Sequence, residues 1–133
     1  MATKEVVAFG PFKEFIADGV RMGDTIRLSG SVSIDEQGKT VHAGDIVKQA
    51  QQAYANIAAM LQQFGATMDD IADETLFLTD MSAVMGSEEK MGAFFAARAE
   101  AYGGNPQVAQ SLIGVKELAA PDLMIEIKVI AHV

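Results

Sequence analysis

The chain has 133 residues, half of them hydrophobic, and carries a formal net charge of −8. This length suits a single domain, residues 1–133, with enough chain to bury a hydrophobic core, and the acidic balance disfavours nucleic acid and anionic membrane surfaces as partners. The absence of cysteine excludes disulfide bonds, thiolate catalysis and cysteine-based zinc sites.

No apolar run reaches the roughly 20 residues that a membrane-spanning helix needs. The N-terminus also lacks the charged leader and apolar core of a secretory signal. We therefore expect a cytoplasmic protein whose partners are small molecules or other proteins, with neither nucleic acid nor membrane among them.

The first third of the chain is predicted to form short strands. A β-prone run over 5–9 ends at Gly10-Pro11, and 15–21 is again strand-like. Gly30 interrupts a longer strand over 25–34 and indicates a β-bulge or a close approach of another group to the backbone. Alternation along this strand places Ile26, Leu28, Val32 and Ile34 on one face, and Arg27, Ser29, Ser31 and Ser33 on the other.

The middle of the chain is predicted to form two helices and a largely buried strand over 74–79 between them. Apolar residues recur at helical spacing from 46 to 64, with Asp45 placed to cap the start and Gly65 to end the helix. The second helix is predicted from Ser82 or Ser87 to Tyr102. Four acidic residues follow the first predicted helix, and we interpret them as a solvated connection because they lack the spacing of a calcium-binding loop: Asp69, Asp70, Asp73 and Glu74.

The last quarter contains two predicted strands, over 108–115 and 121–131. In the final strand Leu123, Ile125, Ile127, Val129 and Ala131 share one face, while Met124, Glu126, Lys128 and Ile130 share the other. The order β-β-β-α-β-α-β-β predicts an α+β domain, with a sheet of about six strands and two helices packed on one face. The other face is too apolar for open water and too polar for a dry core, so we expect a closed oligomer.

Five short motifs follow one another along nearly the whole chain: Gly10-Pro11-Phe12, Leu28-Ser29-Gly30, Leu78-Thr79-Asp80-Met81, Phe94-Phe95 and Ile125-Glu126-Ile127. Together with the order of elements, they resemble the YjgF/YER057c/UK114 family, whose best known member is reactive intermediate deaminase A. The resemblance implies a chorismate-mutase-like fold of the bacillus type with a mixed sheet, a homotrimer, and ligand clefts between the subunits. It also implies hydrolysis of enamines and imines to 2-keto acids and ammonia, without a cofactor of the protein's own.

The family's deaminase branch holds the substrate carboxylate with a single arginine, and the matching position here is Gln110. Glutamine is neutral, so the charge-assisted bidentate clamp of a guanidinium is missing. Three functions therefore stay open. They are imine or enamine deamination, a non-catalytic small-molecule-binding or sensor protein, and an endoribonuclease or translation-inhibitor activity, against which the net charge argues.

Glu126 is the candidate catalytic residue. The matching glutamate of the family is thought to position water or to stabilise a protonated intermediate, work that suits a half-buried carboxylate. The alternative for Glu126 is a solvated carboxylate paired with Lys128. Gln110 is expected either to orient the ligand or to lie at the rim of an interface.

The remaining candidates are ligand-binding residues implied by the same resemblance. Ser29, Gly30 and Ser31 either line the cleft or form an ordinary bulged strand. Phe12 matches an aromatic that walls the family's pocket, or it is simply buried. Arg98 is expected at the surface, and His42 and His132 have no partner at metal-ligand spacing, so no metal site is predicted.

Overall fold

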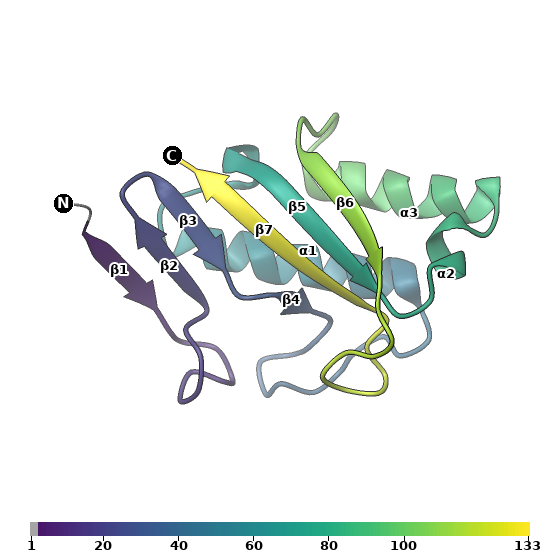
Figure 1. Ribbon diagram of the computed structural model, residues 1–133, viewed down its shortest axis with the longest axis horizontal. Helices are drawn as coiled ribbons and strands as arrows, with labels where there is room; N and C mark the ends of the chain where they lie inside the picture. The colour runs from purple at the N-terminus through teal and green to yellow at the C-terminus, as the bar shows by residue number, and fades with distance from the viewer. Residues whose placement is uncertain (1–2) are drawn as a thin grey trace.

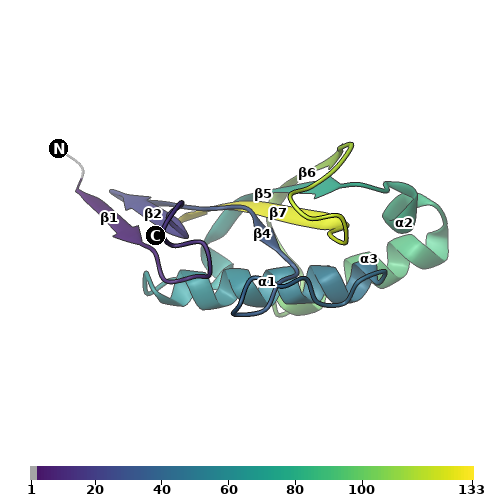
Figure 2. The same ribbon diagram turned by 90° about the horizontal axis from the view of Figure 1, so that it is seen from below.

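A computed structural model describes residues 3–133, which form one mixed β-sheet with helices against a single face (Figure 1 and Figure 2). Within that range the elements are β1 (Lys4–Val7), β2 (Gly19–Met22), β3 (Thr25–Leu28), β4 (Ser31–Val32), α1 (Ile46–Gln62), a 3-10 turn (Met68–Asp70), β5 (Ile71–Leu78), α2 (Ser82–Met85), α3 (Glu88–Ala101), β6 (Ala109–Gly114) and β7 (Ile125–His132). The sheet order is β1-β2-β3-β7-β5-β6, and β4 also pairs with β7. The β5–β6 pair is parallel, whereas β5–β7 and β3–β7 are antiparallel. The predicted α+β class is confirmed, with seven strands in the described part of the chain instead of about six.

Helix α1 begins at its predicted cap, α3 begins after Ser87, one of the two predicted starts, and the helices leave the opposite face of the sheet uncovered (Figure 2). Asp45 accepts a hydrogen bond from the Lys48 backbone N–H at the start of α1, and Ser87 does the same for the Lys90 N–H at the start of α3. The predicted second helix is divided, because α2 ends at Met85 with Gly86 as its C-cap, before the Ser87 cap starts α3. Figure 2 shows both long helices below the sheet and none above it, so one face is open.

Strand β7 lies in the middle of the sheet and alternates as predicted. Its helix-facing side chains are buried in the core: Ile125, Ile127, Val129 and Ala131. Glu126, Lys128 and Ile130 are partly exposed on the open face. The chain just before β7 is fixed by the fully buried Gln49 of α1, whose side-chain amide donates to the Asp122 carbonyl and accepts from the Met124 N–H.

The predicted long strand over 25–34 is interrupted, as the glycine indicated. Strand β3 ends at Leu28 and β4 resumes at Ser31, so Ser29 and Gly30 form a break beside β7. This break reverses the expected alternation, because one extra residue moves every later side chain to the other face. Ser31 therefore points under α1 and donates to the Ala53 carbonyl at 2.7 Å, which corrects its predicted place on the open face.

The same reversal applies to the next two residues. Ser33 is fully buried and donates to the Val41 carbonyl at 2.7 Å. Val32 instead lies opposite Glu126 of β7 and so belongs to the open face.

The N-terminal segment forms less strand than predicted. Strand β2 begins only at Gly19, and the residues before it form a loop in which Phe15 is 85% exposed. Asp18 closes this loop by accepting hydrogen bonds from the Phe9 and Gly10 backbone N–H groups. No helix in residues 3–133 is both long enough and apolar enough to cross a membrane.

Candidate functional site

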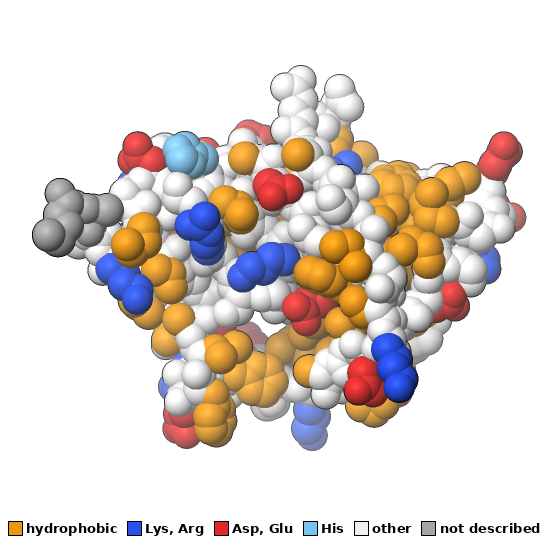
Figure 3. Space-filling view, in the orientation of Figure 1, with side chains coloured by type: hydrophobic (Ala, Val, Ile, Leu, Met, Phe, Trp, Pro, Cys, Tyr) orange, Lys and Arg blue, Asp and Glu red, His pale blue; other side chains and the backbone are white. Residues whose placement is uncertain are grey.

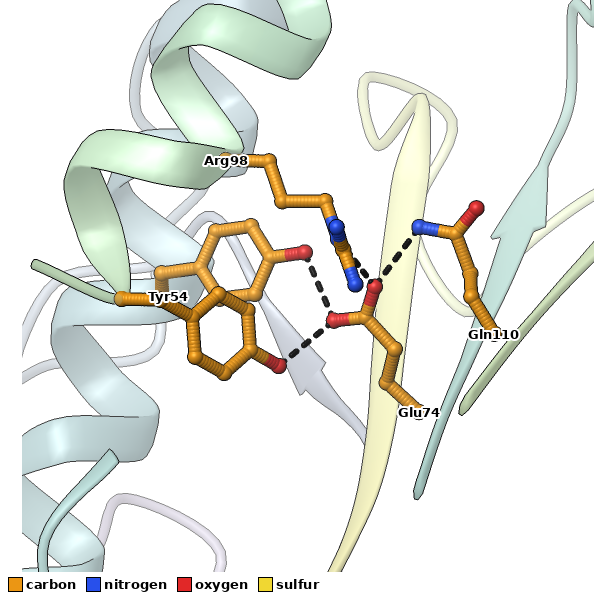
Figure 4. A network of polar contacts seen from close by, with 5 residues as sticks. Tyr54, Glu74, Arg98 and Gln110 are labelled. Carbon is orange, nitrogen blue, oxygen red and sulfur yellow. Dashed lines mark hydrogen bonds and ion pairs between the residues drawn. The ribbon is translucent and has the colours of Figure 1, made fainter. Parts of the chain in front are cut away.

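The helix face of the sheet contains a fully buried carboxylate, Glu74 of β5, surrounded by four donors (Figure 4). The hydroxyls of Tyr54 and Tyr102 donate to Oε1 at 2.8 and 2.7 Å. Arg98 Nε and Gln110 Nε2 donate to Oε2 at 2.5 and 2.7 Å. These donors come from α1, α3 and β6, so the carboxylate ties three elements to β5.

This arrangement corrects two expectations. Glu74 is not part of a solvated connection, and Arg98 does not point into solvent, since its side chain is 11% exposed and forms an ion pair with Glu74. Burial and the Glu74 charge raise the pKa values of Tyr54 and Tyr102 far above their usual range, so both phenols remain donors. Burial alone lowers the pKa of Arg98, but the hydrogen bond and charge of Glu74 outweigh it and raise the pKa overall.

The sequence contained a signal for this cluster. Glu74 is in phase with the buried Leu76 and Leu78 of the same strand, and Arg98 is four residues from both the buried Phe94 and Tyr102. Period-two and helical spacing therefore placed both charged groups on core-facing sides. The sequence did not show that the two groups pair with each other, because they lie on elements that are distant along the chain.

Gln110 belongs to this cluster and not to the open face. It lies directly across from Glu74 in the parallel β5–β6 pair, and its amide N–H points toward the helices (Figure 4). Its neighbour Ser111 is exposed on the open face, in register with Thr75. The structure therefore separates Gln110 from Glu126, because the two side chains project from opposite faces of the sheet.

Glu126 is a second partly or fully buried carboxylate of the sheet, and it lies on the open face, opposite to the face of Glu74. On β7 it lies between Val32 of β4 and Phe77 of β5. Burial raises the pKa of its carboxyl group, and the nearby positive charge of Lys128 offsets part of that shift. Among residues 3–133 no group donates a hydrogen bond to this carboxylate, in contrast to the four donors around Glu74.

Gly30 makes room for this carboxylate. A Cβ atom built at Gly30 would overlap the Glu126 carboxylate oxygen Oε2, so the expected close approach at this glycine is confirmed. The adjacent Ser29 hydroxyl donates to the Ala17 carbonyl at 2.6 Å and is already engaged. Of the predicted ligand-binding residues, Gly30 is therefore the one whose contact with Glu126 the structure shows.

Phe12 lies in the loop before β2 and is 46% exposed. Its ring comes near Gly38 in the turn after β4, so the alternative of a simply buried ring is wrong.

The alternative pairing of Glu126 with Lys128 is not formed as a direct contact. Lys128 Nζ donates to the Leu28 carbonyl at 2.5 Å, where β3 breaks off. Within residues 3–133 the one ion pair shorter than 4.0 Å is that between Arg98 and Glu74. The open face therefore holds a carboxylate and an ammonium group as neighbours with a gap between them.

The open face has hydrophobic, acidic and basic side chains around a central hollow (Figure 3). Large hydrophobic side chains of its strands are left uncovered, among them Val6, Met22 and Ile113, which are 42–53% exposed. Two concave regions of about 320 Å³ each lie elsewhere, in the loop over 116–121 and between α1 and α3. Neither is lined by Glu126, whose surroundings are open in a single chain. The described residues contain no group of three or more His, Asp or Glu side chains that could hold a metal ion.

Comparison with known proteins assigns this arrangement to a family. A family model described as Endoribonuclease L-PSP matches residues 5–133. A 2-iminobutanoate/2-iminopropanoate deaminase from Dermatophagoides farinae is 28% identical over 109 residues, which make up 82% of this chain and 76% of that protein.

Solved structures show the same fold. A Rid-family protein of unknown function from Yersinia pestis has a TM-score of 0.83 at 27% identity, and the match covers 98% of this chain and 100% of that one. A member of the YjgF/YER057c/UK114 family from Mycobacterium tuberculosis has a TM-score of 0.79 at 25% identity with the same coverage. The expected family and fold class are confirmed.

Proposed function

Because the chain belongs to the Endoribonuclease L-PSP family, also known as YjgF/YER057c/UK114, we propose that it hydrolyses small 2-imino acids and their enamine tautomers. The products are a 2-oxo acid and ammonia. The name of the deaminase relative supports this reaction class. The observation that carries the proposal is the state of Glu126, which is half-buried, raised in pKa and free of hydrogen-bond donors among the described residues.

These properties suit a group that moves protons. Ionised Glu126 takes a proton from water as the water oxygen bonds to the iminium carbon, giving a tetrahedral amino alcohol. The protonated carboxyl group then returns that proton to the amino nitrogen. The C–N bond breaks and ammonia leaves. The hydroxyl oxygen becomes the carbonyl of the 2-oxo acid, and its proton passes to the ionised Glu126, which releases it to water. A raised pKa favours the first step, because it makes the Glu126 carboxylate a stronger base toward water.

A homotrimer with ligand clefts between subunits is part of the same proposal. The uncovered hydrophobic side chains of the open face support it, as does the lack of walls around Glu126 in one chain. A second copy placed on this face would separate Glu126 from bulk water and supply the missing walls. Light scattering should give three times the chain mass of 14.1 kDa, and a monomer mass at micromolar concentration would contradict the trimer.

The second candidate function is non-catalytic binding of a small metabolite. It is favoured by the lack of a guanidinium group on the open face of β6, where Ser111 projects and Gln110 does not. A ribonuclease reading has less support, since a chain with a net charge of −8 repels RNA phosphates. A cytoplasmic location stays a prediction from composition.

Release of 2-oxo acid from 2-iminobutanoate or 2-aminoacrylate, generated in the assay, tests the proposal. The wild type should exceed the buffer rate, and Glu126→Gln should lower kcat/KM by roughly 10²- to 10⁴-fold. Its matched control is Glu89→Gln on the exposed start of α3, which should keep the wild-type rate. Wild-type clearance no faster than buffer, together with measurable metabolite binding, would establish the second candidate instead.

A further inference from the structure

Three polar side chains lie in one row across the open face. Lys128 of β7 is opposite Thr75 of β5, and Thr75 is in register with Ser111 of β6. All three alternate with helix-facing neighbours and so project from the same side of the sheet. Neighbouring strands are about 4.8 Å apart, so the row spans about 10 Å.

The row has unused hydrogen-bonding capacity. Within residues 3–133 the hydroxyls of Thr75 and Ser111 make no side-chain hydrogen bond, and Lys128 uses one of its three N–H donors on the Leu28 carbonyl. The ammonium group of Lys128 lies on the β3 side of β7, and the two free hydroxyls lie on the other side, on β5 and β6. Ammonium and hydroxyl groups that converge on one point bind an oxyanion.

A second row runs beside the first, two residues along each strand. It contains Glu126, Phe77 and Ile113, again in register. Glu126 lies about 7 Å along β7 from Lys128, on the same face and outside ion-pair distance. The two rows together present a positive group, a negative group and an apolar surface to the same small volume.

A protonated 2-imino acid has the complementary charges, with a carboxylate on one carbon and an iminium group on the next. We infer that the Lys128 side chain turns from the Leu28 carbonyl toward Thr75 and, with the hydroxyls of Thr75 and Ser111, binds the substrate carboxylate in this protein and replaces the family's arginine. The iminium group then faces Glu126, and the substrate side chain lies over Phe77 and Ile113. This orientation selects 2-imino acids with small apolar side chains.

Gln110 cannot take this role from where it stands, because its amide N–H donates to Glu74 on the other face. The inference rests on the proposed deaminase function for the identity of the substrate. The carboxylate site itself can be measured without turnover, through binding of the product 2-oxobutanoate.

Calorimetric titration with 2-oxobutanoate and with its uncharged amide tests the inference. Lys128→Met should weaken binding of 2-oxobutanoate by roughly 10- to 100-fold, the loss expected for a charge-assisted hydrogen bond, and should not change binding of the amide. Lys128→Arg should retain most of the affinity. Ser111→Ala and Thr75→Val should each weaken 2-oxobutanoate roughly 3- to 10-fold. The matched control Lys90→Met, on the exposed start of α3, should bind as the wild type does.

The outcomes separate this inference from the proposed function. If 2-oxobutanoate binding depends on Lys128 but the protein hydrolyses no imine, the carboxylate site is supported and only the deaminase function is overturned. Imine hydrolysis with unchanged affinity in Lys128→Met overturns only the inference, as does an equal or larger loss in Gln110→Ala. If Lys128→Met fails to fold by circular dichroism, Ser111→Ala and Thr75→Val decide, and wild-type affinity in both overturns the inference. A wild type that binds no 2-oxobutanoate also overturns it.

Discussion

Glu74 and Glu126 are glutamates of neighbouring strands in one sheet, and they project from opposite faces of it. Glu74 is fully buried and accepts four hydrogen bonds, whereas Glu126 is half-buried with a raised pKa and has no donor among the described residues. A carboxylate saturated with donors has little capacity left for chemistry and instead fixes the elements that supply them. The contrast assigns Glu74 to the stability of the fold and leaves Glu126 available for the catalytic role that we propose for it.

The largest effect on stability is expected from Glu74→Ala. Removing this side chain leaves Arg98 and two tyrosine hydroxyls without their acceptor under the helices, and breaking a buried ion pair in this way typically costs about 3–5 kcal/mol. Urea denaturation should show a lower midpoint for this variant with an unchanged slope.

The matched control for this variant is the preceding residue of the same strand. Asp73→Ala removes an exposed carboxylate and should change the free energy of unfolding by less than about 0.5 kcal/mol. Equal losses in the two variants would show that Glu74 is not the structural carboxylate of the pair.

The next effect concerns the tyrosines that donate to Glu74. Tyr102→Phe removes one hydrogen bond to a carboxylate and should cost about 1.5–3 kcal/mol. The pKa of Tyr102 is raised in the folded protein, so above about pH 10 the unfolded chain loses a phenolic proton that the folded chain keeps. Stability should therefore fall as pH rises past this value.

The two tyrosines of the chain both lie in this cluster. If they contribute equally, the tyrosine-dependent part of the alkaline slope should be reduced by roughly one half in Tyr102→Phe and in Tyr54→Phe. Chemical denaturation at several pH values between 8 and 11, on the order of one unit apart, measures it. If both variants keep the wild-type dependence of stability on alkaline pH, the two tyrosines do not cause that dependence.

The sequence predicted the fold better than the site because the two depend on different distances along the chain. The alternation of β7 and the Asp45 cap of α1 are local patterns, and each appears in the structure where it was expected. The Glu74 cluster joins residues of α1, β5, α3 and β6, and no local pattern specifies that contact.

Gln110 shows how an uncertainty of one residue in the alignment changes the prediction for a strand. In a strand the side-chain face changes with every residue, so an uncertainty of one position moves a candidate from the open face to the helix face. Gln110 and Ser111 differ by that one step. Gly30 reversed the face of Ser31 for the same reason, although the bulge itself was predicted.

A smaller effect is expected from Gly30→Ala, which tests the open face. The added Cβ would meet the Glu126 carboxylate and push it from its position. We expect kcat/KM for imine hydrolysis to fall roughly 10-fold, since catalytic groups tolerate little displacement. Gly92→Ala is the control, because a Cβ added at this position of α3 meets nothing within 4 Å. This variant should keep full activity and gain slightly in stability. Full activity in Gly30→Ala would separate this glycine from the site.

The smallest effect, and one of opposite sign to Glu74→Ala, is expected for the stability of Glu126→Gln. Burial raises the pKa of Glu126 in the folded protein, so above its ordinary pKa the folded state binds its proton more tightly than the unfolded chain does. Stability of the wild type therefore falls as pH rises through this window, and a glutamine escapes that loss. The variant should be as stable as the wild type at pH values below the ordinary carboxyl pKa and slightly more stable at neutral pH, by a margin that Lys128 and solvent keep small. Thermal denaturation across that range measures the difference, and a clear loss of stability at neutral pH would mean that Glu126, like Glu74, serves to hold the fold together.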